Sequence, residues 1–345
     1  MSRSRGLGRP GLLAVGLGIV AAIASTPGVA SADSSTDSYV VMGATGLPDP
    51  ASNAAYWADA LAYIQADLPD STALEPDSTA LEPDSAALEL TTPEDLSPLD
   101  GSLTFDESVS QGVTDLNNAI SADLNGGASV GVLGVSQSAV IASEEMAALD
   151  PSGTPSDLPA FFILLGDPMN PDGGIFERFP GLSIDGISFA GATPADDFPT
   201  TVYTHEYDPI SDFCQYPVDV VCDVNAVAGI IDHSYTAADL ANTFQLPTEG
   251  ATETTYYMIP SELPLLTLLQ EVPVIGTPLA DLIGPDLTYL VNLGYGDPDY
   301  GYSVGPANLA TPVDLLPPAA DLDMMPALLA SGTEEGIQAF IAAIG

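Results

Sequence analysis

Positive charge is what this sequence lacks most. Its 345 residues hold 4 Lys+Arg against 48 Asp+Glu, for a formal net charge of −44, and none of the four bases is a lysine. Nucleic-acid binding depends on clustered basic side chains that neutralise phosphates, so this composition excludes a nucleic-acid partner. Disorder is not expected for the chain as a whole, because 46% of the residues are hydrophobic and only 15% are charged. We therefore expect a folded protein with a strongly acidic surface.

Three of the four bases lie within the first nine residues, ahead of an apolar run from residue 11 to residue 24. The small residues Ala30-Ser31-Ala32 follow, and this layout is typical of a secretory signal peptide over residues 1–32. The run is shorter than the ~20 residues that span a bilayer, so we expect cleavage after Ala32 rather than an uncleaved anchor. The mature chain would be secreted or held in the cell envelope, with Arg178 as its one strong base.

Cysteine is scarce as well. The sequence has two, Cys214 and Cys222, and in an exported protein such a pair is most simply a disulfide that closes a small loop. The alternative is a metal site, which would need three or four converging ligands, and only two distant histidines accompany the cysteines. We therefore expect a disulfide, no metal and no other cofactor.

Short apolar runs alternate with segments of helical spacing. This alternation predicts an α/β fold with a mostly parallel sheet flanked by helices, whose chemistry lies beyond the carboxyl ends of the strands. The expected strands cover residues 38–42, 129–133, 160–165 and 200–206, and the expected helices cover 51–66, 108–124 and 140–149.

An acidic seven-residue repeat interrupts this alternation at residues 68–98. Its copies at 74–80 and 81–87 each contain a proline, which a coiled coil would not tolerate. We expect a poorly ordered surface insertion that the fold does not need. The catalytic-type domain would then span residues 33–312, with residues 313–345 as a C-terminal tail.

A candidate nucleophile follows the strand at residues 129–133. Ser136 lies in the string Gly134-Val135-Ser136-Gln137-Ser138, between that strand and a helical run. A serine in a sharp strand-to-helix turn with small neighbours two residues away is typical of the nucleophile elbow of α/β-hydrolases. Ser138 stands where the second glycine of the usual pattern would be, and it is still small.

A serine nucleophile needs a base, and the chain has two histidines. His205 falls inside an expected strand, where an ordinary structural side chain is the simpler interpretation. His233 lies in a loop ahead of a new helical stretch, so we favour His233 as the base.

The acid that orients the histidine is harder to choose among so many carboxylates. Asp208 directly follows the strand that ends near residue 206, which gives the chain order Ser, Asp, His of α/β-hydrolases. We favour Asp208, with Asp212 as the next candidate; Asp167 and Asp219 also lie close to expected strand ends or loops.

An oxyanion hole requires donors aimed at the developing negative charge. The backbone N–H of Gln137 would be one donor. The second is expected from the loop that begins at Gly43, with the Thr45 hydroxyl as an added donor; the alternative is a tight turn with no catalytic part.

Several strings together resemble the PE-PPE domain of mycobacteria and related actinobacteria, a cutinase-like serine α/β-hydrolase family. The resemblance covers about residues 38–312 and rests on VMGATG (41–46), GVSQSA (134–139), LGDP (165–168), NPDGG (170–174), RFPGL (178–182), GATP (191–194), YDP (207–209), the stretch ending at His233, YYMIP (256–260) and NLGYG (292–296). The acidic repeat and the cysteine pair depart from this family, although the bridged loop between an acid and a histidine is similar to that of cutinases.

The resemblance implies hydrolysis or transfer of acyl chains on lipid-like esters, with Ser136 acylated, His233 moving the proton and an Asp orienting it. We expect a secreted serine esterase or lipase-like enzyme. The alternatives are an acyltransferase that moves fatty acyl chains onto cell-envelope glycolipids, and a non-catalytic acidic surface protein. The Leu- and Pro-rich segment at 263–290 could be core or a cap that lines an acyl groove. Arg178 is expected to form a structural ion pair, with a substrate anion as the alternative.

Overall fold

The computed structural model describes residues 37–67 and 86–344. The expected signal peptide and residues 68–85 of the expected insertion lie outside these described residues. Everything below concerns the described part of the chain.

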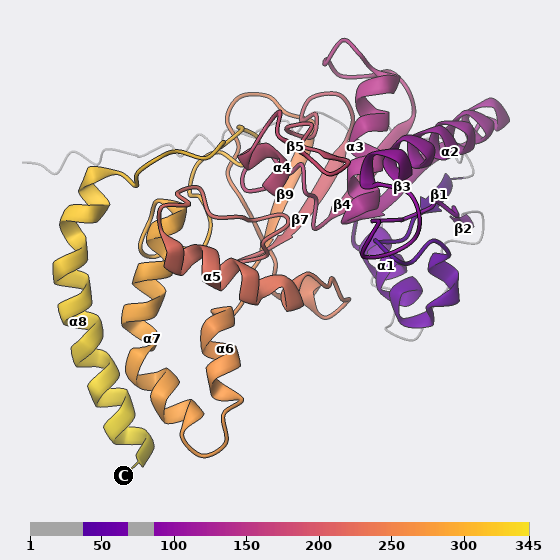
Figure 1. Ribbon diagram of the computed structural model, residues 1–345. Helices are drawn as coiled ribbons and strands as arrows, with labels where there is room; N and C mark the ends of the chain where they lie inside the picture. The colour runs from indigo at the N-terminus through magenta and orange to yellow at the C-terminus, as the bar shows by residue number, and fades with distance from the viewer. Residues whose placement is uncertain (1–36, 68–85, 345) are drawn as a thin grey trace, which may run out of the picture. The chain divides into compact units, whose positions relative to one another are not determined.

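A seven-stranded sheet organises this part of the chain, with the order β2-β1-β3-β4-β7-β9-β8 (Figure 1). All neighbouring strands pair in parallel except β8 and β9, so the predicted mostly parallel sheet is confirmed. The strands are β1 (Asp37–Val41), β2 (Ala86–Glu89), β3 (Ser129–Val135), β4 (Ala160–Leu165), β7 (Thr200–His205), β8 (Phe244–Gln245) and β9 (Thr254–Ile259), and β5 (Ser183–Ile184) pairs separately with β6 (Ile187–Ser188).

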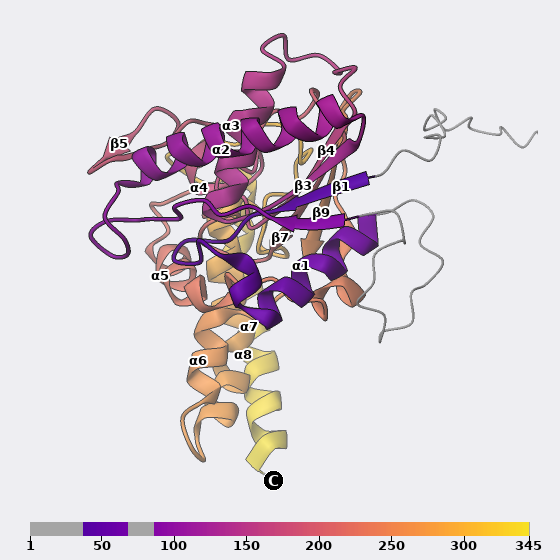
Figure 2. The same cartoon turned by 90° about the vertical axis from the view of Figure 1, so that its right-hand side faces the viewer.

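Helices cover both faces of the sheet. Figure 2 shows α2 on one side of the strands and α1 on the other. The helices are α1 (Ala54–Asp67), α2 (Phe105–Gly126), α3 (Gln137–Leu149), α4 (Ile175–Arg178), α5 (Val220–Ala228), α6 (Pro264–Gln270), α7 (Gly276–Asn292) and α8 (Ala319–Ile344), with 3-10 turns η1 (Pro50–Ser52), η2 (Gly229–Asp232), η3 (Asp239–Asn242) and η4 (Leu293–Tyr295).

The alternation of side chains along the strands explains the two cores. In β3, Val130 and Val132 join the cluster that packs under α2 and α3, whereas Leu133 and Val135 join the cluster under α1. Successive side chains of a strand point to opposite faces, so a strand buried on both faces must be apolar almost throughout. These strands are apolar for that reason, and their parallel arrangement brings their carboxyl ends to one edge.

The expected boundary of the insertion is wrong for residues 86–98. Strand β2 pairs in parallel with β1, and the side chains of Thr92 and Glu94 are buried. No proline lies between residues 86 and 92, so the backbone of β2 can donate and accept hydrogen bonds along the free edge of β1. Leu90 packs against the core, which holds this segment in the domain.

The Leu- and Pro-rich segment forms the helices α6 and α7, and α7 packs against both α6 and α8. Leu263 and Val291 are buried there, whereas Leu268 and Val274 are exposed. The segment is therefore partly core and partly surface, and the expected tail supplies α8. Among the described residues, no helix is both long and apolar enough to cross a membrane.

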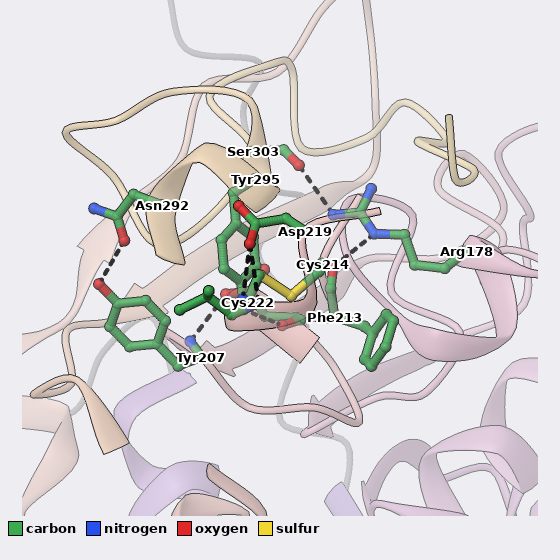
Figure 3. The surroundings of a disulfide bond; sticks show 11 residues. Arg178, Tyr207, Phe213, Cys214, Asp219, Cys222, Asn292, Tyr295 and Ser303 are labelled. Carbon is green, nitrogen blue, oxygen red and sulfur yellow. Dashed lines mark hydrogen bonds between the residues drawn. A yellow bond between two sulfur atoms is a disulfide. The ribbon is translucent and has the colours of Figure 1, made fainter. Parts of the chain in front are cut away.

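Cys214 and Cys222 form the expected disulfide, and Figure 3 shows that Arg178 lies near it. The Arg178 side chain is fully buried. Its Nε donates to the carbonyl of Phe213 (2.8 Å), and its terminal nitrogens donate to Ser303 Oγ (3.0 Å) and to the carbonyl and hydroxyl of Thr311.

The expected ion pair of Arg178 is wrong as a direct contact, because no carboxylate of the described residues lies within 4.0 Å of its guanidinium. Burial lowers the pKa of Arg178, and the charges of Asp172 and Asp212 partly offset this effect. Thr311 links Arg178 to Asp172, since its hydroxyl also donates to the Asp172 carboxylate (3.0 Å). A fully buried guanidinium cannot meet a substrate anion, so Arg178 is structural.

Arg178→Gln should lower the free energy of unfolding by about 3 kcal/mol, because it leaves buried carbonyls and acids without their cation. Urea unfolding followed by the fluorescence of Trp57, the single tryptophan, measures this loss. Thr311→Val is the matched control and should cost only about 1 kcal/mol, because it removes a neutral partner. Equal losses in the two variants would contradict a special role for the buried charge.

Candidate active site

Ser136 occupies a strained turn between β3 and α3. Its backbone has φ 58° and ψ −113°, a conformation that residues other than glycine rarely adopt, and its N–H donates to the carbonyl of Leu165 (2.9 Å). Gly134 is required here, since a Cβ would lie 2.5 Å from the carbonyl oxygen of Ser138. The Ser138 hydroxyl contacts both the N–H (2.8 Å) and the carbonyl (3.1 Å) of Val135, so the serine in place of the usual glycine fastens the turn.

His233 and Asp208 form a close pair. Nδ1 of His233 lies 2.7 Å from Oδ2 of Asp208. Asp208 comes three residues after the end of β7 and is fully buried, whereas His233 follows η2 and is partly exposed. The structure therefore brings together the histidine and the acid that the sequence favoured.

Three further groups hold the Asp208 carboxylate. Oδ2 also accepts from the hydroxyls of Ser211 (2.7 Å) and Tyr235 (2.9 Å), and Oδ1 accepts from the backbone N–H of Ile210 (2.9 Å). Burial alone would raise the pKa of Asp208, but the charge of His233 and the hydrogen bonds from His233, Ser211 and Ile210 outweigh burial and leave this pKa below its usual value. Asp208 is thus held as a carboxylate.

The position of the His233 ring follows from Gly166. A Cβ on Gly166 would lie 2.6 Å from Cε1 and 3.1 Å from Nδ1 of His233, so the ring packs against the backbone directly after β4. The neighbouring residue, Leu165, accepts the hydrogen bond from Ser136. The elbow and the His–Asp pair therefore lie at adjoining strand ends. Nε2 of His233 is buried and has no hydrogen-bond partner within the described part of the chain.

His205 has different partners. Its Nδ1 lies 3.1 Å from Ser261 Oγ, and its Nε2 lies 3.5 Å from Asp239 Oδ2. The ring of His205 thus contacts Ser261 and Asp239, whereas the ring of His233 contacts Asp208.

The other candidate acids are engaged elsewhere. Asp212 accepts from the N–H of Tyr207 (3.1 Å), and burial raises its pKa well above the usual value. Asp167 accepts from the N–H of Met169 (2.9 Å), and burial raises its pKa to about 6. Asp219 caps α5. Among the four candidate acids, Asp208 is the one whose carboxylate contacts His233.

The residues expected to form the oxyanion hole lie together. Nε2 of Gln137 lies 3.4 Å from the Thr45 hydroxyl, and Gln137 follows Ser136 directly. Gly43 leaves no room for a side chain, because a Cβ there would lie 1.7 Å from the carbonyl oxygen of Leu47. The loop from Gly43 to Gly46 is therefore tightly turned beside the elbow.

Residues 94 and 95 connect the loop from Gly43 to Gly46 with the elbow at Ser136, and no feature of the sequence predicted this connection. The carbonyl of Glu94 accepts from the N–H of Gly46 (2.9 Å), and the carbonyl of Asp95 accepts from Nε2 of Gln137 (3.0 Å). Glu94 has a φ of 51°, and its side chain is fully buried. Burial raises the pKa of Glu94 to about 8, although the Thr92 hydroxyl donates to it at 2.6 Å.

Ser211 and Tyr235 were also missed as partners of Asp208. A weak signal for Tyr235 was its place two residues after His233; Ser211 gave none. Among the described residues, no group of three or more His, Cys, Asp or Glu side chains could hold a metal ion.

A serine on a strand-to-helix elbow, with an Asp–His pair at the adjoining strand end, defines the α/β-hydrolase class of fold. Within that class the chain belongs to the PE-PPE domain family, because the family model described as the PE-PPE domain matches residues 83–296.

Relatives come from Mycobacterium tuberculosis (strain H37Rv). The uncharacterized PPE family protein PPE28 is 40% identical over 94% of this chain and 49% of its own length. Esterase PE16 is 41% identical over 66% of this chain and 44% of its own length. SL1278 acyltransferase Chp1 is 31% identical over 62% of this chain and 53% of its own length. The chain thus spans about half the length of these curated relatives.

Among solved structures, the catalytic core domain of acetyl xylan esterase from Trichoderma reesei is similar with a TM-score of 0.28 and 16% identity. The similarity covers 49% of this chain and 84% of that one.

Glu94→Gln should flatten the pH dependence of stability. The unfolded chain ionises Glu94 near its usual pKa of 4.5, whereas the folded chain keeps the proton up to about pH 8. Between these values the folded state binds more protons, so the wild type loses stability as pH rises, by at most ~1.4 kcal/mol per pH unit from this one group.

Urea unfolding of wild type and variant at several pH values from 4 to 9 isolates this contribution as a difference. The variant should gain stability relative to the wild type up to about pH 8 and hold a constant lead above it. Parallel curves for the two proteins would show that Glu94 does not carry a buried proton.

Proposed function

We propose that this chain is an exported serine acyl hydrolase that cleaves lipid-like acyl esters through an acyl-Ser136 intermediate. The observation that carries the proposal is the 2.7 Å contact between His233 and Asp208, beside the strand end that holds Ser136. The names of two relatives, an esterase and an acyltransferase, support acyl-ester chemistry. Export is proposed from the arginine-rich start, the short apolar run and the Ala30-Ser31-Ala32 exit.

In the proposed first step, Ser136 Oγ attacks the ester carbonyl while Nε2 of His233 takes the hydroxyl proton. Asp208 holds Nδ1 of His233 and stabilises the imidazolium that forms, because it is a carboxylate that keeps a depressed pKa in a buried site. The backbone N–H of Gln137 and the loop with Thr45 stabilise the oxyanion. His233 then returns the proton to the leaving alcohol, and the acyl group stays on Ser136.

In the second step, a hydroxyl group attacks the acyl-serine while His233 again takes the proton. If water attacks, the product is a free acid and the chain is an esterase. If a sugar or lipid hydroxyl attacks, the acyl group is transferred. Transfer to a cell-envelope glycolipid is therefore the second candidate, favoured by the similarity to an acyltransferase.

Ser136→Ala should lower the turnover of p-nitrophenyl butyrate by about 10⁵-fold or more, because it removes the nucleophile. A fluorophosphonate probe should label the wild type at Ser136, and labelling should be absent in the variant. A wild type that neither reacts with the probe nor cleaves the ester would sink the proposal and favour a non-catalytic surface protein.

Asp208→Asn should reduce kcat by about 10²- to 10⁴-fold with little change in KM, because the histidine loses its orienting charge. Asp212→Asn is the matched control: Asp212 is equally buried and four residues away, but its contact is with Tyr207. This control should keep kcat within about threefold, since the asparagine oxygen can still accept that hydrogen bond. The reverse ranking would make Asp212 the acid.

A further inference from the structure

A polar cavity lies next to the His–Asp pair. Its volume is about 340 Å³, within the ~300–1,000 Å³ typical of small-molecule sites. The end of β7 contributes His205, and η3 contributes Asp239. Ser261 and Glu262 follow β9, and Thr267 comes from α6. We call this cavity the hydroxyl pocket.

The loop after His233 completes the pocket with two more hydroxyls, those of Ser234 and Thr236. Ser234 is the residue next to the proposed base. The ring of Tyr235 packs edge-on against both histidines, with its centroid 4.8 Å from that of His205 and 6.0 Å from that of His233. A ligand in the pocket would therefore lie beside the loop that carries the proposed catalytic histidine.

The polar groups of the pocket are fixed before any ligand arrives. His205 bridges Ser261 and Asp239 through its two ring nitrogens. Oδ2 of Asp239 also accepts from the N–H (2.6 Å) and the hydroxyl (2.9 Å) of Thr236. Such cross-linked side chains lose little freedom on binding, which favours affinity.

Hydrogen-bonding capacity remains. Within the described part of the chain, the Ser234 hydroxyl, the Glu262 carboxylate and Oδ1 of Asp239 have no protein partner, so they can bond to a ligand. The pocket thus offers both acceptors and donors.

The lining decides the class of ligand. Every side chain that lines the pocket carries a polar group, so the lining favours a ligand with polar groups over an acyl chain. No arginine or lysine lines it, and Asp239 and Glu262 would repel a phosphate, sulfate or carboxylate. Hydroxyls and carboxylates that accept and donate at several points match a neutral ligand with many hydroxyl groups.

We propose that the hydroxyl pocket binds a neutral sugar group and presents it to the acyl-enzyme. This inference rests on the proposed acyl chemistry of Ser136. In the transfer step, a sugar hydroxyl oxygen bonds to the acyl carbon, the bond from that carbon to Ser136 Oγ breaks, and the hydroxyl proton passes through His233 to Ser136. A sugar ester entering as substrate would leave its sugar in the same pocket.

Two substitutions that leave the proposed catalytic residues intact test the pocket. Thr267→Val removes a hydroxyl at constant shape, and Glu262→Gln removes a charge from an exposed side chain. Both variants should hydrolyse p-nitrophenyl butyrate like the wild type. Thr267→Val should raise the concentration of methyl β-D-glucopyranoside that half-saturates formation of the butyryl sugar by about fivefold, the effect of one lost hydrogen bond. Glu262→Gln should raise it by a similar factor, because a neutral amide oxygen accepts a weaker hydrogen bond than a carboxylate does.

A second arm of the experiment separates an accepting sugar from a leaving sugar. With an octanoyl ester of the same glucoside as substrate, the variants should raise KM if the pocket holds a leaving sugar. Butan-1-ol as acceptor is the control and should respond to neither substitution. Unchanged values in both arms would overturn the proposal.

Binding can be read without catalysis. Saturation-transfer NMR with Ser136→Ala protein and methyl β-D-glucopyranoside should give a signal that Thr267→Val weakens. If the sugar binds but the wild type cleaves no ester, the acyl chemistry fails and the pocket stands. If the ester is cleaved but the sugar neither binds nor accepts the acyl group, the pocket fails alone. Stronger, salt-sensitive binding of glucosamine would instead identify a site for cations and overturn the proposal.

Discussion

The shortage of positive charge determines how this domain stabilises its buried acids. A buried carboxylate is usually paired with a cation, but the described part of the chain has one arginine and no lysine to offer. Two solutions remain, and both occur. Asp208 stays ionised because neutral hydroxyls, a backbone N–H and His233 surround it. Glu94 and Asp167 hold raised pKa values instead, since burial outweighs their few donors. The difference in surroundings, not in residue type, sets Asp208 apart as the acid beside the histidine.

The sheet could be predicted from the sequence because parallel strands buried on two faces must be apolar along their length. The runs at residues 129–133 and 160–165 obey that rule, and strands β3 and β4 stand there. The edge strand β2 escaped prediction, because one side of an edge strand is open and it tolerates an acidic, irregular sequence. The prolines of the two repeat copies, Pro76 and Pro83, led to the expectation of a poorly ordered insertion, but they precede β2 and leave its backbone free to pair.

The three candidate catalytic residues and their order along the chain could be predicted from the sequence, but the residues that hold them in place could not. Ser136, Asp208 and His233 carry local signals: an elbow string, a position after a strand and a loop histidine. Ser211, Tyr235 and residues 94–95 act through contacts that exist only after the chain has folded. A hydroxyl in a loop or a carbonyl after a strand looks the same in sequence whether or not it reaches a partner 27 or 42 residues away. The direct ion pair expected for Arg178 was wrong for the same reason, because backbone carbonyls and hydroxyl groups are the hydrogen-bond partners of its guanidinium.

The contacts of Arg178 have a consequence for the order of folding. Its partners at Ser303 and Thr311 lie 125 and 133 residues further along the chain. Until those residues arrive, a charged group at the centre of the domain faces only part of its shell, so an incomplete chain has no finished interior. An N-terminal fragment that ends before residue 303 would therefore lack two partners of its buried charge, so the stability of the core depends on the last quarter of the chain.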